Sequence, residues 1–123
     1  YEVRASPLVF EDGLQSRDFI YVLDTVDAVI KLYDVMPAGE SANIATNNQV
    51  SIRDLLQQIC REMGYSGEIG RKPARKSDVL CHNGSNEKIR GMIDYSLTSL
   101  DVGLPITLDW YKNSLQPKSN SQQ

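Results

Sequence analysis

The sequence is poor in the residues from which metal and nucleophilic sites are usually built. Among 123 residues it has one histidine and two cysteines. Cys60 and Cys81 lack metal-type spacing, so we expect free thiols in a reducing, cytoplasmic compartment. His82 has no Ser or Cys partner at a recognisable spacing, which argues against nucleophilic catalysis. We therefore expect no metal site in this chain and no catalytic role for His82.

Long apolar runs and an excess of positive charge are also missing. No apolar run approaches the ~20 residues that a membrane helix needs, and we expect no secretory signal. Thirteen Lys and Arg against sixteen Asp and Glu leave a net charge of −3, which argues against a general nucleic-acid or membrane binder. The length is that of one domain. The chain opens at Tyr1 without a starting methionine, which is compatible with a piece of a longer protein.

What the sequence does contain is an alternation of short apolar runs and helical patterns. Runs rich in β-branched or aromatic residues predict short strands at Leu8–Phe10, Asp18–Val22, Ala42–Thr46 and Glu68–Gly70. Helical patterns run from Asp24 to about Val35, from Ser51 to Met63, from Glu87 to Met92 and from Ser99 to Leu115. Residues 71–85 are polar and loop-like. The expected class is α/β, with a few short strands and about four helices.

Two of these helices have clear local signals. Asp24 and Asp27 have the spacing of an N-terminal capping pair, and an apolar stripe at 3, 4 and 7 spacing follows. Ser51 and Asp54 make the same pair at the start of the strongest helix, which Gly64 ends. Pro105 lies inside the last helical pattern and should kink that helix or shift its start.

A basic cluster lies between the second and third predicted helices. It comprises Arg71, Lys72, Arg75 and Lys76. Three interpretations are open: a solvated loop, a nucleic-acid or targeting patch, and a phosphate clamp in which arginine forks match phosphate oxygens. Asp78 fits the last of these, because a carboxylate beside phosphate-binding cations can accept hydrogen bonds from sugar hydroxyls.

Several segments, taken in order, resemble one protein family. They are Gly13-x-x-x-Arg17-Asp18-Phe19-Ile20-Tyr21-Val22-x-Asp24, Asn43–Thr46, Val50–Leu55, Arg75-x-Ser77-Asp78-Val79, Asn86-x-Lys88-Ile89-Arg90, Ser99-Leu100-x-x-Gly103-Leu104 and Trp110-Tyr111. This pattern resembles the extended short-chain dehydrogenase/reductases, the NAD-dependent nucleotide-sugar epimerases and dehydratases. It departs from them at Lys76, where a proline is usual, and at Gly91–Asp94, where Gly-Trp-x-Pro is common.

The resemblance implies that the chain is the C-terminal, substrate-binding part of such an enzyme and lacks the Rossmann cofactor domain. Residues 1–116 would form the nucleotide-sugar-binding domain, and residues 117–123 a disordered polar tail. No tyrosine is followed by lysine four residues later, and no glycine-rich dinucleotide loop follows a strand. The resemblance therefore implies that this chain has no catalytic residue and is inactive alone, with NAD(P) bound by the missing N-terminal domain of the full-length enzyme.

The resemblance also implies three substrate-binding residues. Arg17 and Arg75 would contact the diphosphate of the nucleotide-sugar, and Asp78 would accept from its ribose hydroxyls. Two alternatives stay open: a stand-alone module that forms homo-oligomers, and a nucleic-acid binder that uses the cluster at residues 71–76.

Overall fold

The computed structural model describes residues 6–73 and 79–114, and in these ranges the chain forms four helices and four short strands. In chain order they are β1 (Leu8–Phe10), β2 (Ser16–Arg17), α1 (Val22–Tyr33), β3 (Val50–Ser51), α2 (Ile52–Glu62), β4 (Gly70–Lys72), α3 (Glu87–Arg90) and α4 (Leu100–Ser114). The predicted α/β class is confirmed. The predicted tail at residues 117–123 lies outside the described residues.

The strands form two separate pairs. β1 runs parallel to β4, with Leu8 opposite Gly70. β2 runs antiparallel to β3, with Arg17 opposite Val50. An isolated parallel bridge between Ser16 and Cys81 brings a third segment of the chain against β2.

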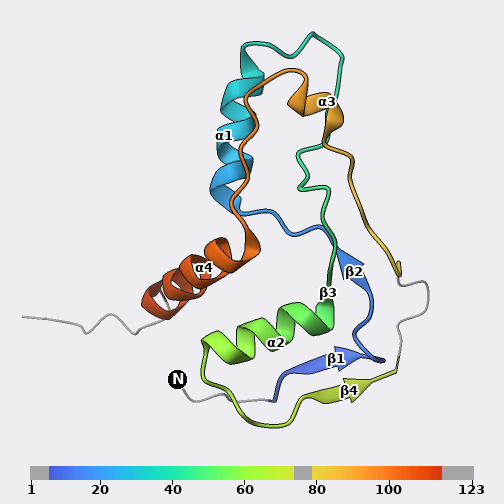
Figure 1. The fold of residues 1–123 in the computed structure, drawn as a ribbon, viewed down its shortest axis with the longest axis vertical. Coiled ribbons are helices and arrows are strands. Elements are labelled where there is room, and N and C mark those ends of the chain that lie inside the picture. Colours follow the sequence, from blue (N-terminus) through green and yellow to red (C-terminus); the bar gives the residue numbers. More distant parts are fainter. Residues whose placement is uncertain (1–5, 74–78, 115–123) are drawn as a thin grey trace, which may run out of the picture.

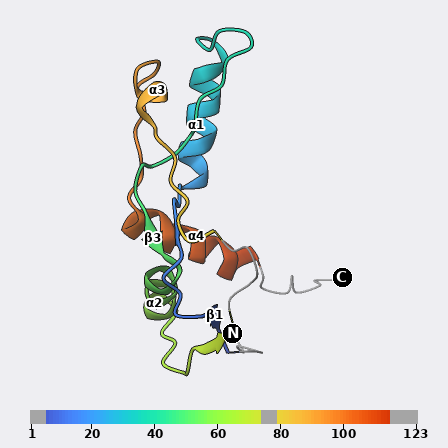
Figure 2. The same cartoon turned by 90° about the vertical axis from the view of Figure 1, so that its right-hand side faces the viewer.

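The molecule is elongated, and its two ends are built differently (Figure 1). At one end α1 and α3 lie beside the extended segments that connect them to the rest of the chain. At the other end α2 lies over the β1–β4 pair, while β2 and β3 occupy the middle. Figure 2 shows α4 crossing near the junction of the two ends. The chain therefore passes through the middle several times, and β2 lies where these passages meet.

The hydrophobic core is small and lies between α1 and α3. Its buried residues are Ala28, Leu32, Ile89 and Tyr95, and the partly buried residues packed against them are Ile20, Met36, Ala42, Ile44, Met92, Ile93 and Leu97. The core therefore combines two helices with connecting segments that have no regular structure.

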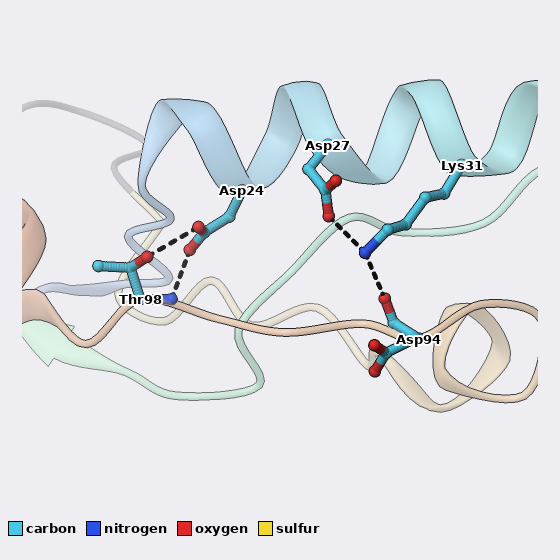
Figure 3. Close-up of polar contacts among 5 residues, drawn as sticks. All are labelled: Asp24, Asp27, Lys31, Asp94 and Thr98. Atoms are coloured by element: carbon cyan, nitrogen blue, oxygen red, sulfur yellow. Dashed lines mark hydrogen bonds and ion pairs between the residues drawn. The ribbon is translucent and has the colours of Figure 1, made fainter.

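The first helix is confirmed, but its capping and its orientation differ from the prediction. It begins at Val22, and its N-cap is Tyr21 rather than Asp24. Asp24 is instead bonded to Thr98 in the segment before α4 (Figure 3). The apolar stripe faces outward, with Ile30 66% and Tyr33 87% exposed. The small, opposite face that carries Ala28 and Leu32 is buried.

Two predicted strands are wrong. In place of the strand predicted at Asp18–Val22, the chain forms β2, which begins two residues earlier. Residues 18–21 have no regular structure, because Asp18 forms hydrogen bonds with the loop that contains Thr46. Residues 42–46 are also irregular. The Ala45 carbonyl accepts from the side chains of Asn86 and Tyr95, at 3.1 and 2.9 Å, so side chains take the place of a strand partner.

The second helix agrees with the prediction in detail. The Ser51 hydroxyl accepts from the Asp54 N–H at 3.0 Å. At the C-terminus Gly64 has φ +64°, its N–H donates to Arg61, and the Tyr65 N–H donates to Cys60. This is a Schellman ending, which needs a residue in the left-handed region. Cys60 is buried, as expected of a cysteine on the helix's inner face.

The elements after α2 agree only in part with those predicted from the sequence. α3 is confirmed, and α4 begins at Leu100, directly after the predicted Ser99. Pro105 lies inside α4 without shifting its start. The strand predicted at Glu68–Gly70 instead begins at Gly70 and continues to Lys72, so it takes up the first two residues of the expected polar loop. Its pairing with β1 decides this register.

Candidate functional site

The candidate site is centred on Arg17, which ends β2. The Arg17 Nη1 atom donates to the Ser16 carbonyl at 2.8 Å and to the Val79 carbonyl at 2.7 Å. The guanidinium is thus held against a segment 62 residues away in the sequence. Pairing of β2 with β3 fixes the backbone from which this side chain extends. Arg17 is therefore held at a junction of three segments of the chain, with its side chain partly buried.

Its neighbour Asp18 has a different, structural set of partners. The Asp18 carboxylate accepts from the backbone N–H groups of Thr46 and Asn47 at 3.0 Å, and from the Thr46 hydroxyl at 2.5 Å. Asn47 has φ +59°, so the chain turns sharply around this carboxylate. The Asp18 side chain thereby fixes the loop before β3, which in turn positions the strand opposite Arg17.

A polar cluster on the other side of β2 was not anticipated from the sequence. The Ser16 hydroxyl donates to Gln49 Oε1 at 3.0 Å, and Gln49 Nε2 donates to Cys81 Sγ at 3.0 Å. The Cys81 thiol donates back to Gln49 Oε1 at 3.2 Å. These three residues are far apart in the sequence, and only the fold brings them together.

Two of the three predicted substrate-binding residues, Arg75 and Asp78, lie outside the described residues, as does Lys76. The other two cations of the basic cluster, Arg71 and Lys72, are exposed on β4. Val79, whose carbonyl binds Arg17, is the next residue in the sequence after Asp78. His82 belongs to the same segment, and its backbone N–H donates to the Ser16 carbonyl at 3.2 Å.

An apolar hollow of about 540 Å³ lies between the start of α1 and the second half of α4. Its lining residues are Ile20, Tyr21, Val22, Leu23, Ile106, Thr107, Trp110 and Tyr111. The Trp110 and Tyr111 rings contact edge to face at 5.0 Å between centroids. Arg17 is not among the lining residues, so the hollow and the Arg17 site are separate features.

Neither a metal centre nor a membrane helix is found in the part of the chain that the structure describes. Within residues 6–73 and 79–114, no three His, Cys, Asp or Glu side chains cluster in a way that could hold a metal ion. In the same ranges no helix is long and apolar enough to cross a bilayer. Cys60 and Cys81 are both free thiols.

Comparison with known proteins points to one family. Residues 2–45 match the model of the NAD dependent epimerase/dehydratase family. A putative UDP-glucose 4-epimerase of Methanocaldococcus jannaschii is 30% identical over 109 residues, which cover 89% of this chain and 35% of that protein. The chain spans about a third of the length of the first curated relatives it matches.

Solved structures show the same relationship at the level of the fold. The crystal structure of UDP-glucose 4-epimerase with UDP-glucose from Thermotoga maritima aligns with a TM-score of 0.84 and 28% identity, over 90% of this chain and 36% of that one. A structure of MoeE5 in complex with UDP-glucuronic acid and NAD aligns with a TM-score of 0.79 and 26% identity, over 88% of this chain and 37% of that one.

Proposed function

We propose that this chain, a homologue of the NAD dependent epimerase/dehydratase family, supplies the nucleotide-sugar-binding C-terminal part of a sugar-modifying enzyme. In this proposal the chain binds and orients substrate, while the rest of such an enzyme binds NAD(P) and carries the catalytic tyrosine and lysine. The cofactor would supply hydride transfer. The residues of this chain would hold the diphosphate and the ribose.

The observation that carries the proposal is the position of the Arg17 guanidinium. It is fixed by two backbone carbonyls at the junction of β2 with the segment that begins at Val79. Asp78 is the residue before Val79, and Arg75 lies four residues before Val79. The proposal assigns the second arginine and the ribose acceptor to these two positions of the sequence.

Charge and geometry favour a diphosphate as the group that is bound. Charge-assisted hydrogen bonds between arginine and phosphate are stronger than neutral ones, and the planar fork of arginine fits two oxygens at once. Each such bond contributes about 1.5–3 kcal/mol. Two arginines on one diphosphate would anchor the nucleotide and leave the sugar to be presented to a neighbouring cofactor site.

Calorimetric titration of the 123-residue chain with UDP-glucose, dTDP-glucose and GDP-fucose tests the proposal. At least one should bind, and Arg17→Ala or Arg75→Ala should weaken that binding about 10- to 100-fold. Arg17→Lys should rescue only in part, because a point charge cannot reproduce the fork. Asp78→Asn should cost less, since one acceptor oxygen remains.

Arg61→Ala is the matched control, because Arg61 is an exposed arginine in the last turn of α2. It should leave the affinity unchanged. Equal effects of Arg61→Ala and Arg17→Ala, or no binding of any of the three nucleotide-sugars, contradict the proposal. None of the three should be turned over by the chain alone with NAD supplied.

A further inference from the structure

Segment 79–82 is joined to β2 by few backbone hydrogen bonds. The Ser16 N–H donates to the Leu80 carbonyl at 2.9 Å, and the His82 N–H donates to the Ser16 carbonyl at 3.2 Å. The pairing amounts to a single parallel bridge between Ser16 and Cys81. A contact this short needs further bonds to hold its register, because ladders gain their stability from many such pairs.

The side chain of Gln49 provides those further bonds. Its carbonyl oxygen accepts from the Ser16 hydroxyl, and its amide nitrogen donates to the Cys81 sulfur, both at 3.0 Å. One amide therefore spans the two residues that face each other in the bridge. Gln49 directly precedes β3, which pairs with β2 on the other side.

Arg17 is affected by this arrangement through the same segment. One of the two carbonyls that hold Arg17 Nη1 belongs to Val79, two residues before Cys81. A shift of segment 79–82 along β2 would therefore move one anchor of the guanidinium while the other, the Ser16 carbonyl, stayed in place. The position of the guanidinium depends on the register that the side chains of Ser16, Gln49 and Cys81 maintain.

We propose that Gln49 is a positioning residue for the substrate site: it locks segment 79–82 against β2 and so sets the Arg17 guanidinium in place for a nucleotide diphosphate. The part that concerns the diphosphate rests on the proposed function. The part that concerns the register of segment 79–82 does not, and it is measured without a ligand.

The first measurement is amide hydrogen exchange of the ligand-free chain, read at Ser16 and His82. In Gln49→Ala both amides should exchange about tenfold faster, because the loss of the three side-chain hydrogen bonds of Gln49 favours local opening. Cys81→Ala should act in the same direction, and it should add little in the Gln49→Ala background. Gln57→Ala, which removes an exposed glutamine of α2, is the matched control and should change neither amide.

The second measurement is the affinity for whichever of UDP-glucose, dTDP-glucose and GDP-fucose binds the chain. Gln49→Ala should weaken binding about three- to tenfold in the wild-type background and hardly at all in Arg17→Ala, because Gln49 acts through Arg17. A merely structural role would weaken both backgrounds equally. Equal weakening, or unchanged exchange at Ser16 and His82 in Gln49→Ala, overturns the proposal.

Failure of the proposed function has a different signature. If none of the three nucleotide-sugars binds the wild-type chain, the proposed function fails. In that case the ¹⁵N resonances of the Arg17 guanidinium replace affinity as the readout. They should shift in Gln49→Ala and stay unchanged in Gln57→Ala, and absence of that shift overturns the positioning role.

Discussion

The carboxylate of Asp24, in the first turn of α1, accepts two hydrogen bonds from Thr98, which lies 74 residues further along the chain (Figure 3). The Thr98 N–H donates at 2.6 Å and its hydroxyl at 2.8 Å. This contact fixes the start of α1 to the segment that leads into α4. It also explains why Asp24 does not cap the helix: its side chain is directed across the structure to another part of the chain.

Removal of this carboxylate should destabilise the fold. Asp24→Ala leaves the Thr98 N–H without its acceptor, and we expect the free energy of unfolding to fall by about 1–3 kcal/mol. Urea denaturation followed by circular dichroism measures it. Asp27→Ala is the matched control one turn later, since the exposed Asp27 pairs with Lys31 (2.7 Å) and such surface pairs contribute little. Equal losses in the two variants would contradict this account.

Gly13 should be far less tolerant of a side chain than Gly39. Both have positive φ, +71° and +80°, so alanine at either position costs about 1–2 kcal/mol in backbone conformation. At Gly13 a Cβ would also lie 3.1 Å from the Cβ of Arg53, whereas nothing lies within 4 Å at Gly39. Thermal unfolding of the two variants should therefore show the larger loss for Gly13→Ala. A larger loss for Gly39→Ala would refute the steric part of the prediction.

Stability should depend on the ionisation of Tyr95 at high pH. Burial raises the pKa of the Tyr95 phenol above its ordinary value, and the charge of Asp18 adds to the shift. The folded state therefore favours the neutral phenol, and this preference contributes to the free energy of unfolding. The contribution is complete below the pKa of about 10 that the phenol has in the unfolded chain, and it is lost as the pH rises through the higher pKa of the folded state. Unfolding free energies of wild type and Tyr95→Phe, measured from pH 8 upward, should converge above pH 10. If the two unfolding free energies instead change in parallel with pH, the raised pKa of Tyr95 is contradicted.

The exposed apolar stripe of α1 should make the isolated chain self-associate or leave it only marginally stable. Exposed apolar patches of this kind are interaction surfaces or aggregation sites. Ile30→Glu places a charge in the stripe and should lower the average mass in sedimentation at high concentration. Gln57→Glu adds the same charge on the exposed surface of α2 and should leave the mass unchanged. A wild-type chain that is a stable monomer at high concentration would contradict the prediction.

The chain alone should not bind NAD measurably. Its sequence has no glycine-rich loop between a strand and a helix, and such a loop is what brings a helix N-terminus to the pyrophosphate of a dinucleotide. Calorimetric titration with NAD should show no heat of binding. Titration with UDP-glucose, dTDP-glucose and GDP-fucose, of which the proposed function requires at least one to bind, serves as the positive control. Micromolar binding of NAD would overturn the prediction.

Local patterns determined much of the secondary structure. The Ser51 cap, the Schellman ending at Gly64 and the short helix at α3 depend on residues close in the sequence, and the sequence predicts all three. The family resemblance was also readable, because it rests on the order of several short motifs. These features depend on interactions within a few residues, so the sequence carries enough information about them.

The tertiary structure alone decided which face of α1 is buried and where the strands pair. The 3, 4 and 7 spacing predicts a helix, but the larger apolar stripe faces outward, and Ala28 and Leu32 pack on α3. Likewise, no local signal unites Ser16, Gln49 and Cys81, or brings Arg17 to Val79. Such contacts join distant segments, and their free energies depend on geometry that only the folded chain establishes.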